Sequence, residues 1–384
     1  MERTELFLLA RGIELPVQSL DAISGISNGT SYGDPAAPLS RVVAHWFNLP
    51  RWHGTDHLVA QTINGSPQVV AGGRSVYESD GWKITLDVRA DHKAIFSDVR
   101  QTDVHVMTHV MEVRRLDGTS FTATEVEPLL SALHLGLSFA LGRWVAPALP
   151  VGQNDQGETV WGQWGPMLCD PARKTSSGWW YPEDQESLAA LLDCLLPSFR
   201  DPGREQSLRL QIQYAITAIV DRGFVEQRIM SGAAGLEHVM WQELVLNSRL
   251  TEAEFKSHSW PAHKKLRWLL MDAETDLRVR ADQLPAAAFF VAGLEVSGER
   301  LPDGADVVTR VRNRLVHPKE EQEPVYRIKG LVAETWFLTR HYLTMLVLHS
   351  IGYRGRYQDL SRTNGWVGET MPVPWAARHS ATGE

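Results

Sequence analysis

The spacing of apolar residues divides the chain into two parts. In the first ~150 residues, short apolar runs such as QVVAGG, WKITLDV and AIFSDV end at Gly, Asp or Ser, which is typical of β-strands. After residue ~185, apolar residues recur every three or four positions, as in EQSLRLQIQYAITAIVDRG and FVEQRIMSGAAGLEHVMWQELVLNS. This pattern predicts an α+β fold, with a β-rich N-terminal domain followed by an all-α antiparallel helical bundle.

Turn and cap signals refine this division. In VHVMTHVMEVRRLDGTSFTATEV, two alternating runs flank Asp117-Gly118, a dipeptide suited to a tight hairpin turn. Residues 128–144 have helical spacing and should pack on the sheet. Thr251, with Glu254 three residues later, is typical of a capping box at a helix start.

The least periodic stretch suggests where the domains meet. Residues 150–184 are rich in Gly, Pro, Asp and Trp, and are expected to be long loops or irregular strands. We therefore expect a sensor or regulatory domain over 1–184 and a bundle over 185–360. Residues 323–352 should form one long helix ending at Gly352, and residues 361–384 a loosely ordered tail.

Composition limits the functional classes. The 384 residues are 43% hydrophobic and 22% charged, close to an ordinary globular protein. With a net charge of -8, nucleic acid could be bound only at a local basic site. Two cysteines make no disulfide framework, and we find no signal-peptide core and no apolar run long enough to span a membrane. The expectation is a cytoplasmic protein that does not bind membranes.

Histidine clusters offer weak metal candidates. The chain has no phosphate-binding P-loop, no GxGxxG after a strand and no GxSxG elbow. A strand over 104–112 would place histidines and methionines on one face, opposite a valine core, and the loop WHGTDH adds three more potential ligands. The residues concerned are His105, Met107, His109, Met111, His53, Asp56 and His57. Packing and turn formation explain both groups better, so no metal or other cofactor is predicted.

The fourteen tryptophans allow two interpretations. Many sit beside Gly, Pro or Asn, where an indole ring packs over the edge of a core or lines a groove. Packing is favoured, and the alternative is a trigger-binding surface that stacks on a nucleic acid or contacts a phage or other protein. The residues in question are Trp46, Trp52, Trp161, Trp164, Trp179 and Trp180.

Residues 308–320, VTRVRNRLVHPKE, concentrate cations in an acidic chain. On a helix turning ~100° per residue, Arg310, Asn313, Arg314 and His317 form one stripe, while residues 308, 311 and 315 face the core. Arg312 falls on the apolar side, where a cation must be paired or must face another chain. The alternative is a solvated face favourable to the helix dipole, with residue 317 as the C-terminal cap.

This segment resembles a known signature. RNRLVH, with Arg312, Asn313 and His317, looks like the R-N-xxx-H motif of the HEPN family of helical domains. AAGLEHVMW, with Glu237, is similar to the family's upstream acidic position, and YLTMLVLHSIGYRGRY looks like the last helix of ApeA-like HEPN proteins. Those proteins join a β-rich domain to a HEPN bundle and act in anti-phage defence.

The resemblance implies an activity. Active HEPN members are dimeric, metal-independent endoribonucleases, so this chain is expected to cleave RNA through its 2′-hydroxyl, leaving a 2′,3′-cyclic phosphate, as a defence effector or toxin. The roles expected are acid–base catalysis by His317, charge stabilisation by Arg312 and orientation by Asn313, with Glu237 pairing Arg312. Further phosphate contacts would come from Arg310, Arg314 and Lys319.

Three alternatives stay open. The bundle could be a non-catalytic HEPN scaffold that binds RNA or a protein. The β-rich domain could be a glycan- or protein-binding module, with the helical half only dimerising. A metalloenzyme using the loop over 53–57 is the third. In the favoured hypothesis the partners are the RNA substrate and a second copy of the chain, joined through the bundle.

Overall fold

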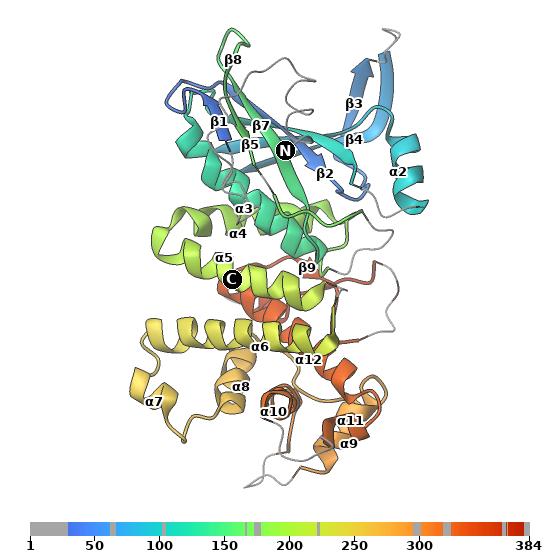
Figure 1. Ribbon diagram of the computed structural model, residues 1–384, viewed down its shortest axis with the longest axis vertical. Helices are drawn as coiled ribbons and strands as arrows, with labels where there is room; N and C mark the ends of the chain where they lie inside the picture. Colours follow the sequence, from blue (N-terminus) through green and yellow to red (C-terminus); the bar gives the residue numbers. More distant parts are fainter. Residues whose placement is uncertain are drawn as a thin grey trace, which may run out of the picture.

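The computed structural model describes residues 30–61, 67–101, 105–165, 167–172, 178–220, 223–294, 301–317, 324–362, 366 and 368–379. An antiparallel sheet lies at one end of the long axis, and layers of helices follow it to the other end (Figure 1). This is the α+β architecture predicted from the periodicity, with the strands before the helices. Within the described residues, no helix has both the length and the apolar character needed to cross a membrane.

The sheet has eight strands in the order β1-β8-β7-β2-β6-β5-β4-β3. Their bounds are β1 Thr30–Gly33, β2 Arg41–Phe47, β3 Asp56–Gln61, β4 Pro67–Ser79, β5 Trp82–Val88, β6 Met107–Arg115, β7 Ala146–Gln153 and β8 Thr159–Trp164. Alternate residues of β2 (Val42, Ala44, Trp46) are buried, because side chains of a strand point to opposite faces. A short helix, α2 (His92–Gln101), lies between β5 and β6.

Helix α3 (Ala123–Leu141) separates the sheet from the remaining helices (Figure 1). It begins at a capping box formed by Thr122 and Glu125, and Gly142 ends it in the left-handed conformation. Most of its second half is buried, because the sheet covers one side and further helices cover the other.

The helical half is built from long and short helices. They are α4 Gln185–Arg200, α5 Pro202–Ile219, α6 Val225–Trp241, α7 Glu252–Lys256, α8 Ala262–Asp272, α9 Pro285–Ala292, α10 Gly304–Val316, α11 Pro324–Arg327 and α12 Leu331–Ser350. One hydrophobic cluster runs without interruption from the sheet through α3 and α4 to α12. The sheet and the bundle therefore share a core.

Two sequence predictions in the sheet are wrong. The run AIFSDV lies in α2, where Ile95 and Phe96 are buried in two separate hydrophobic clusters. The predicted hairpin at Asp117-Gly118 is only a turn, since β6 pairs on its two sides with β2 and β5. No edge of β6 was left for a following strand, and the capping box at Thr122 starts a helix instead.

Residues 150–184, expected to be loops or irregular strands, include β8 and the second half of β7. Two later predictions are corrected. The segment expected to form one long helix is two, α11 and α12, because Gly330 has a φ of 95°. The described part of the expected loose tail is packed: β10 (Met371–Pro372) pairs with β9 (Arg356–Tyr357), and Trp375 Nε1 donates to the Tyr353 carbonyl at 2.6 Å. By contrast, the capping box at Thr251 is confirmed.

Candidate functional site

Helix α10 carries the Arg-His segment, and its sequence explains both its start and its orientation. Asp303 is the N-cap and forms a capping box with Asp306. Val308 and Val311 are buried and Leu315 packs against the core, as the periodicity predicts. The opposite side of the helix is left for the polar residues.

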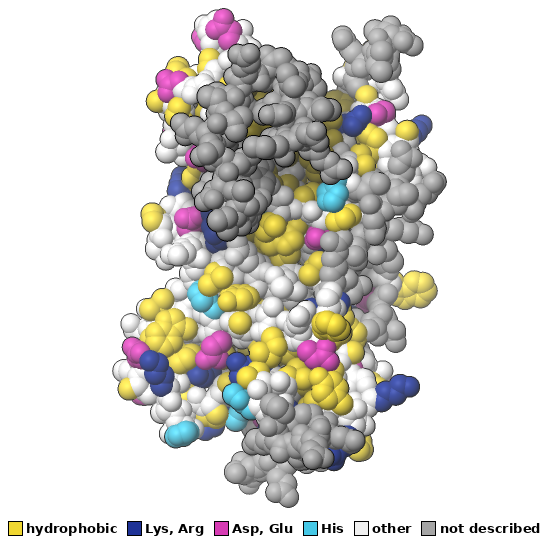
Figure 2. Space-filling view, viewed as in Figure 1, with side chains coloured by type: hydrophobic (Ala, Val, Ile, Leu, Met, Phe, Trp, Pro, Cys, Tyr) yellow, Lys and Arg dark blue, Asp and Glu magenta, His cyan; other side chains and the backbone are white. Residues whose placement is uncertain are grey.

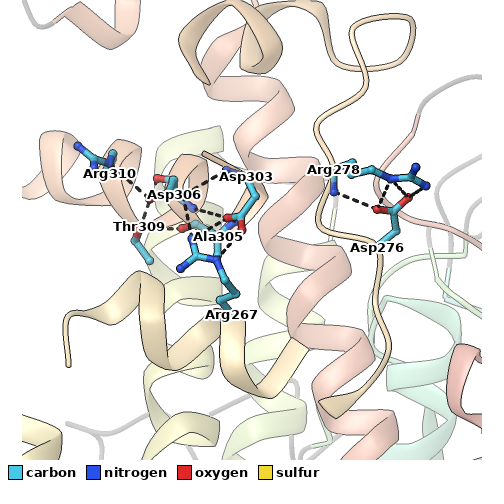
Figure 3. Close-up of polar contacts among 8 residues, drawn as sticks. All are labelled: Arg267, Asp276, Arg278, Asp303, Ala305, Asp306, Thr309 and Arg310. Atoms are coloured by element: carbon cyan, nitrogen blue, oxygen red, sulfur yellow. Dashed lines mark hydrogen bonds and ion pairs between the residues drawn. The ribbon is translucent and has the colours of Figure 1, made fainter. Parts of the chain in front are cut away.

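A buried charge network holds α10 against α8 (Figure 3). Arg267 Nε and Nη2 donate to the two carboxylate oxygens of Asp303 at 2.5 and 2.9 Å, and Nη2 also donates to Asp306 at 2.8 Å. The Asp306 side chain is fully buried, and Arg310 Nε lies 3.7 Å from its second oxygen. The Asp306 carboxylate, which Arg267 holds in place, therefore orients the Arg310 side chain.

One cleft, of about 740 Å³, lies between α6, α7, α8 and α10. Arg312 and Asn313 line it from α10, and Glu237 lines it from α6. Arg312 is half-buried, and its Nη1 donates to Asn313 Oδ1 at 3.1 Å. The cation expected on the apolar side of the helix therefore faces a cleft and not the dry core.

A second cleft, of about 500 Å³, lies between α9 and α10. Arg310, Asn313, Arg314 and His317 line it, together with the apolar side chains of Phe290 and Leu294. These four polar residues are the stripe predicted from the helical wheel. His317 is exposed at the C-cap of α10, where the helix dipole favours a cation. Asn313 lines both clefts and so joins them.

The structure gives Glu237 a different ion-pair partner from the one expected. Its carboxylate lies 3.7 Å from Nζ of Lys265, in place of the predicted pairing with Arg312. Burial lowers the pKa of the Lys265 ammonium, and Glu237 partly opposes this shift. Glu237 keeps 53% of its side chain exposed, so it remains accessible from the cleft.

The predicted site residues therefore separate into two groups that meet at Asn313. Arg312 and Glu237 belong to the first cleft, and Arg310, Arg314 and His317 to the second. Lys319 lies outside the described residues. Sequence reasoning missed Arg267, Asp306 and Lys265. The D-x-x-D spacing of the capping box at the start of α10 could have indicated Asp306, but the sequence offered no signal for the other two residues.

The histidine–methionine face of β6 is a core face. His109 and Met111 are buried, whereas Val110 is only half-buried, so the expected valine core is on the wrong side. The His109 ring stacks on Trp52 at 4.9 Å, and burial lowers the pKa of His109 to about 3. Across the part of the chain that the structure describes, His, Cys, Asp and Glu form no group of three or more that could hold a metal ion.

Most of the tryptophans considered for trigger binding are core residues. Of the six candidates, all but Trp164 are buried: Trp46, Trp52, Trp161, Trp179 and Trp180. The indole N–H of Trp52 donates to Ser75 Oγ at 2.9 Å, and that of Trp180 to the Asp184 carbonyl at 2.7 Å. The five buried rings cannot stack on a trigger, so the packing interpretation holds for them. A trigger at the N-terminal domain stays a prediction.

Together, the fold and the site define a two-part α+β protein whose helical half carries clefts lined by arginine and histidine. Figure 2 shows basic, acidic, histidine and hydrophobic side chains intermixed over this half. Residues 34–175 match the family model described as the YopA central domain, and residues 201–372 match the YopA C-terminal domain.

A curated relative matches both halves. The chain is similar to the SPbeta prophage-derived uncharacterized protein YopA of Bacillus subtilis (strain 168), with 27% identity over 317 residues, 80% of this chain and 67% of the relative. No solved structure matches the chain. None of these matches carries the HEPN name, so the HEPN resemblance stays a prediction.

Proposed function

We propose that this chain is a metal-independent endoribonuclease that uses the polar face of α10. The observation that supports this most is the second cleft, where Arg310, Arg314 and His317 converge beside Asn313. Two guanidinium groups can bind phosphate oxygens, and an exposed imidazole can transfer protons near neutral pH. The single cleft combines both requirements of RNA cleavage through the 2′-hydroxyl.

The step balances without any cofactor. The imidazole of His317 takes the proton of the 2′-hydroxyl, O2′ forms a bond to phosphorus, and the bond from phosphorus to O5′ breaks. An imidazolium protonates the leaving O5′, and the product keeps a 2′,3′-cyclic phosphate. Arg310, held by the buried carboxylate of Asp306, is a preorganised cation for the charge on the phosphorane-like transition state.

The positions of Arg312 and His317 favour a homodimer. They are five positions apart along α10 and its C-cap, which is about 140° around the helix, and they line different clefts. Within one copy, the Arg312 guanidinium and the His317 imidazole therefore do not contact the same phosphate. A second copy placed across α10 would bring its own His317 or Arg312 to the scissile group and would supply the second proton carrier.

The test is cleavage of a labelled RNA in EDTA by the purified chain, with analysis of the product ends. We expect cyclic phosphate ends and a loss of at least about a hundredfold in rate for His317→Ala, the usual contribution of a general acid or base. The matched control is His57→Ala, an exposed histidine on β3, which should keep full activity. Equal cleavage by both variants would contradict the assignment.

A role in phage–host conflict follows from the same proposal. The similar Bacillus protein is described as prophage-derived. We expect expression of the wild-type chain to slow growth, and the His317→Ala variant to be tolerated. Equal toxicity of both proteins would mean that the growth effect does not depend on His317.

One observation favours a second function. Arg312 Nη1 donates to Asn313 Oδ1 within one copy, so this donor and this acceptor are paired without a substrate. A non-catalytic RNA-binding scaffold would also have this arrangement. RNA binding that weakens with salt, without cleavage under any dimerising condition, would support the scaffold.

A further inference from the structure

We infer that the first cleft is a nucleobase pocket that recognises guanine, with Glu237 as the residue that reads the base. This inference rests on the proposed RNA substrate and extends it to base specificity. The cleavage chemistry proposed above leaves this cavity unused. Its volume of about 740 Å³ is in the range of small-ligand pockets.

The lining suits a flat aromatic ligand. Trp241 and Tyr214 are half-buried and contribute side chains to the cleft, and Met240 and Leu266 supply an apolar floor. Trp241 is held by an edge contact with Phe255, with ring centroids 5.2 Å apart. Aromatic surfaces of this kind bind bases by stacking, with little dependence on sequence.

Glu237 adds the selective element. Its carboxylate has two acceptor oxygens, and the ion pair with Lys265 holds it from the side of α8. Lys265 is itself fixed, because its Nζ donates to the Phe255 carbonyl at 3.2 Å and lies 3.4 Å from the centroid of the Phe255 ring. Guanine alone among the RNA bases presents two adjacent N–H donors on its pairing edge, so it can donate to both oxygens of a carboxylate.

The position of the cleft connects base and phosphate. Arg312 and Asn313 stand at its α10 side, and Asn313 also lines the neighbouring cleft with His317. A nucleotide with its base beside Glu237 therefore directs its phosphate toward the cationic face of α10. His238, also in the lining, has its pKa lowered by burial, so it adds no cation that would repel the base edge at neutral pH.

The test uses mononucleotides, so that binding is measured apart from cleavage. GMP and AMP are titrated into the full-length His317→Ala chain, with tryptophan fluorescence or calorimetry as the readout. We expect GMP to bind about tenfold or more tightly than AMP, the discrimination that one bidentate base contact supplies.

The decisive variant is Glu237→Gln. The glutamine amide places an N–H donor beside an acceptor oxygen and so matches adenine, and the preference should shift from GMP to AMP. A merely structural role for Glu237 would weaken both ligands equally. Glu127→Gln, an exposed glutamate on α3, is the matched control and should leave the ratio unchanged.

The outcomes separate this inference from the nuclease proposal. GMP preference that Glu237→Gln reverses supports the pocket, whether or not RNA is cleaved. RNA cleavage through His317 without GMP preference would overturn the pocket and leave the nuclease standing. Equal affinity for GMP and AMP, or no binding of either, would likewise overturn it.

Discussion

The strongest prediction about stability concerns Arg267, whose guanidinium group is buried. Its side chain is 12% exposed, and it pairs with Asp303 at 16% and Asp306 at 0% exposure (Figure 3). Arg267→Met keeps most of the apolar stem but removes the guanidinium. Two neighbouring carboxylates then lose their main counter-charge, one of them without access to water.

Removing one partner of a buried pair costs about 3–5 kcal/mol, because the remaining charge stays uncompensated. We expect a loss of this size in the free energy of unfolding, measured by urea denaturation with tryptophan fluorescence and circular dichroism. Asp306→Asn placed in the Arg267→Met background should recover part of the loss, since it removes a buried charge whose nearest remaining cation, Arg310, lies at 3.7 Å. A double-mutant cycle then gives the coupling between the two residues.

The chain supplies its own control for this experiment. Arg278 pairs with Asp276 in similar geometry, at 2.8 Å, but its side chain is 81% exposed. Exposed pairs contribute little, so Arg278→Met should leave the unfolding curve nearly unchanged. If the two methionine variants lost the same stability, the argument from burial would be refuted.

Three further predictions follow from other contacts. His109→Gln should flatten the pH dependence of the free energy of unfolding. Burial lowers the pKa of the imidazole to about 3, so it contributes stability above pH ~6.5 and loses this contribution as the pH falls toward 3. Unfolding measured at a series of pH values would show this difference. Gly304→Ala should cost about 1–3 kcal/mol in urea denaturation, because its Cβ would lie 1.8 Å from Tyr342 Oη, whereas Gly203→Ala, with its nearest atom at 3.3 Å, should be close to neutral. If Arg314 contacts a phosphate, Arg314→Ala should lower the slope of log affinity for single-stranded RNA against log salt by about 0.7, and Arg278→Ala should leave it unchanged. Equal slopes for the wild-type chain and both variants would exclude that contact.

The sequence predicted local structure better than pairing. The buried side of α10 was predictable from Val308, Val311 and Leu315, because a helix repeats every 3.6 residues regardless of its neighbours. The strand pairing was not, since the fate of residues 119–125 depends on both edges of β6 being occupied by β2 and β5. That information is distributed along the chain.

The same distinction applies to the candidate site. The stripe of Arg310, Asn313, Arg314 and His317 could be predicted from the rotation per residue alone. The partner of Glu237 could not, because Lys265 lies on a different helix, and any cation of similar reach would satisfy the sequence equally well. Likewise, Arg267 and Asp306 are 39 positions apart, and no periodicity connects them.

The continuous core has a consequence for how the two halves change over time. Gly136 of α3 lies so close to α4 that a Cβ there would fall 2.4 Å from Leu195 Cδ2, so the two helices touch almost backbone to side chain. A larger residue at position 136 requires a smaller one at position 195. Helices α3 and α4 are therefore constrained to evolve together. A chimera that takes the sheet and α3 from one relative and α4 with the other helices from another would combine two helix surfaces that are not matched in shape.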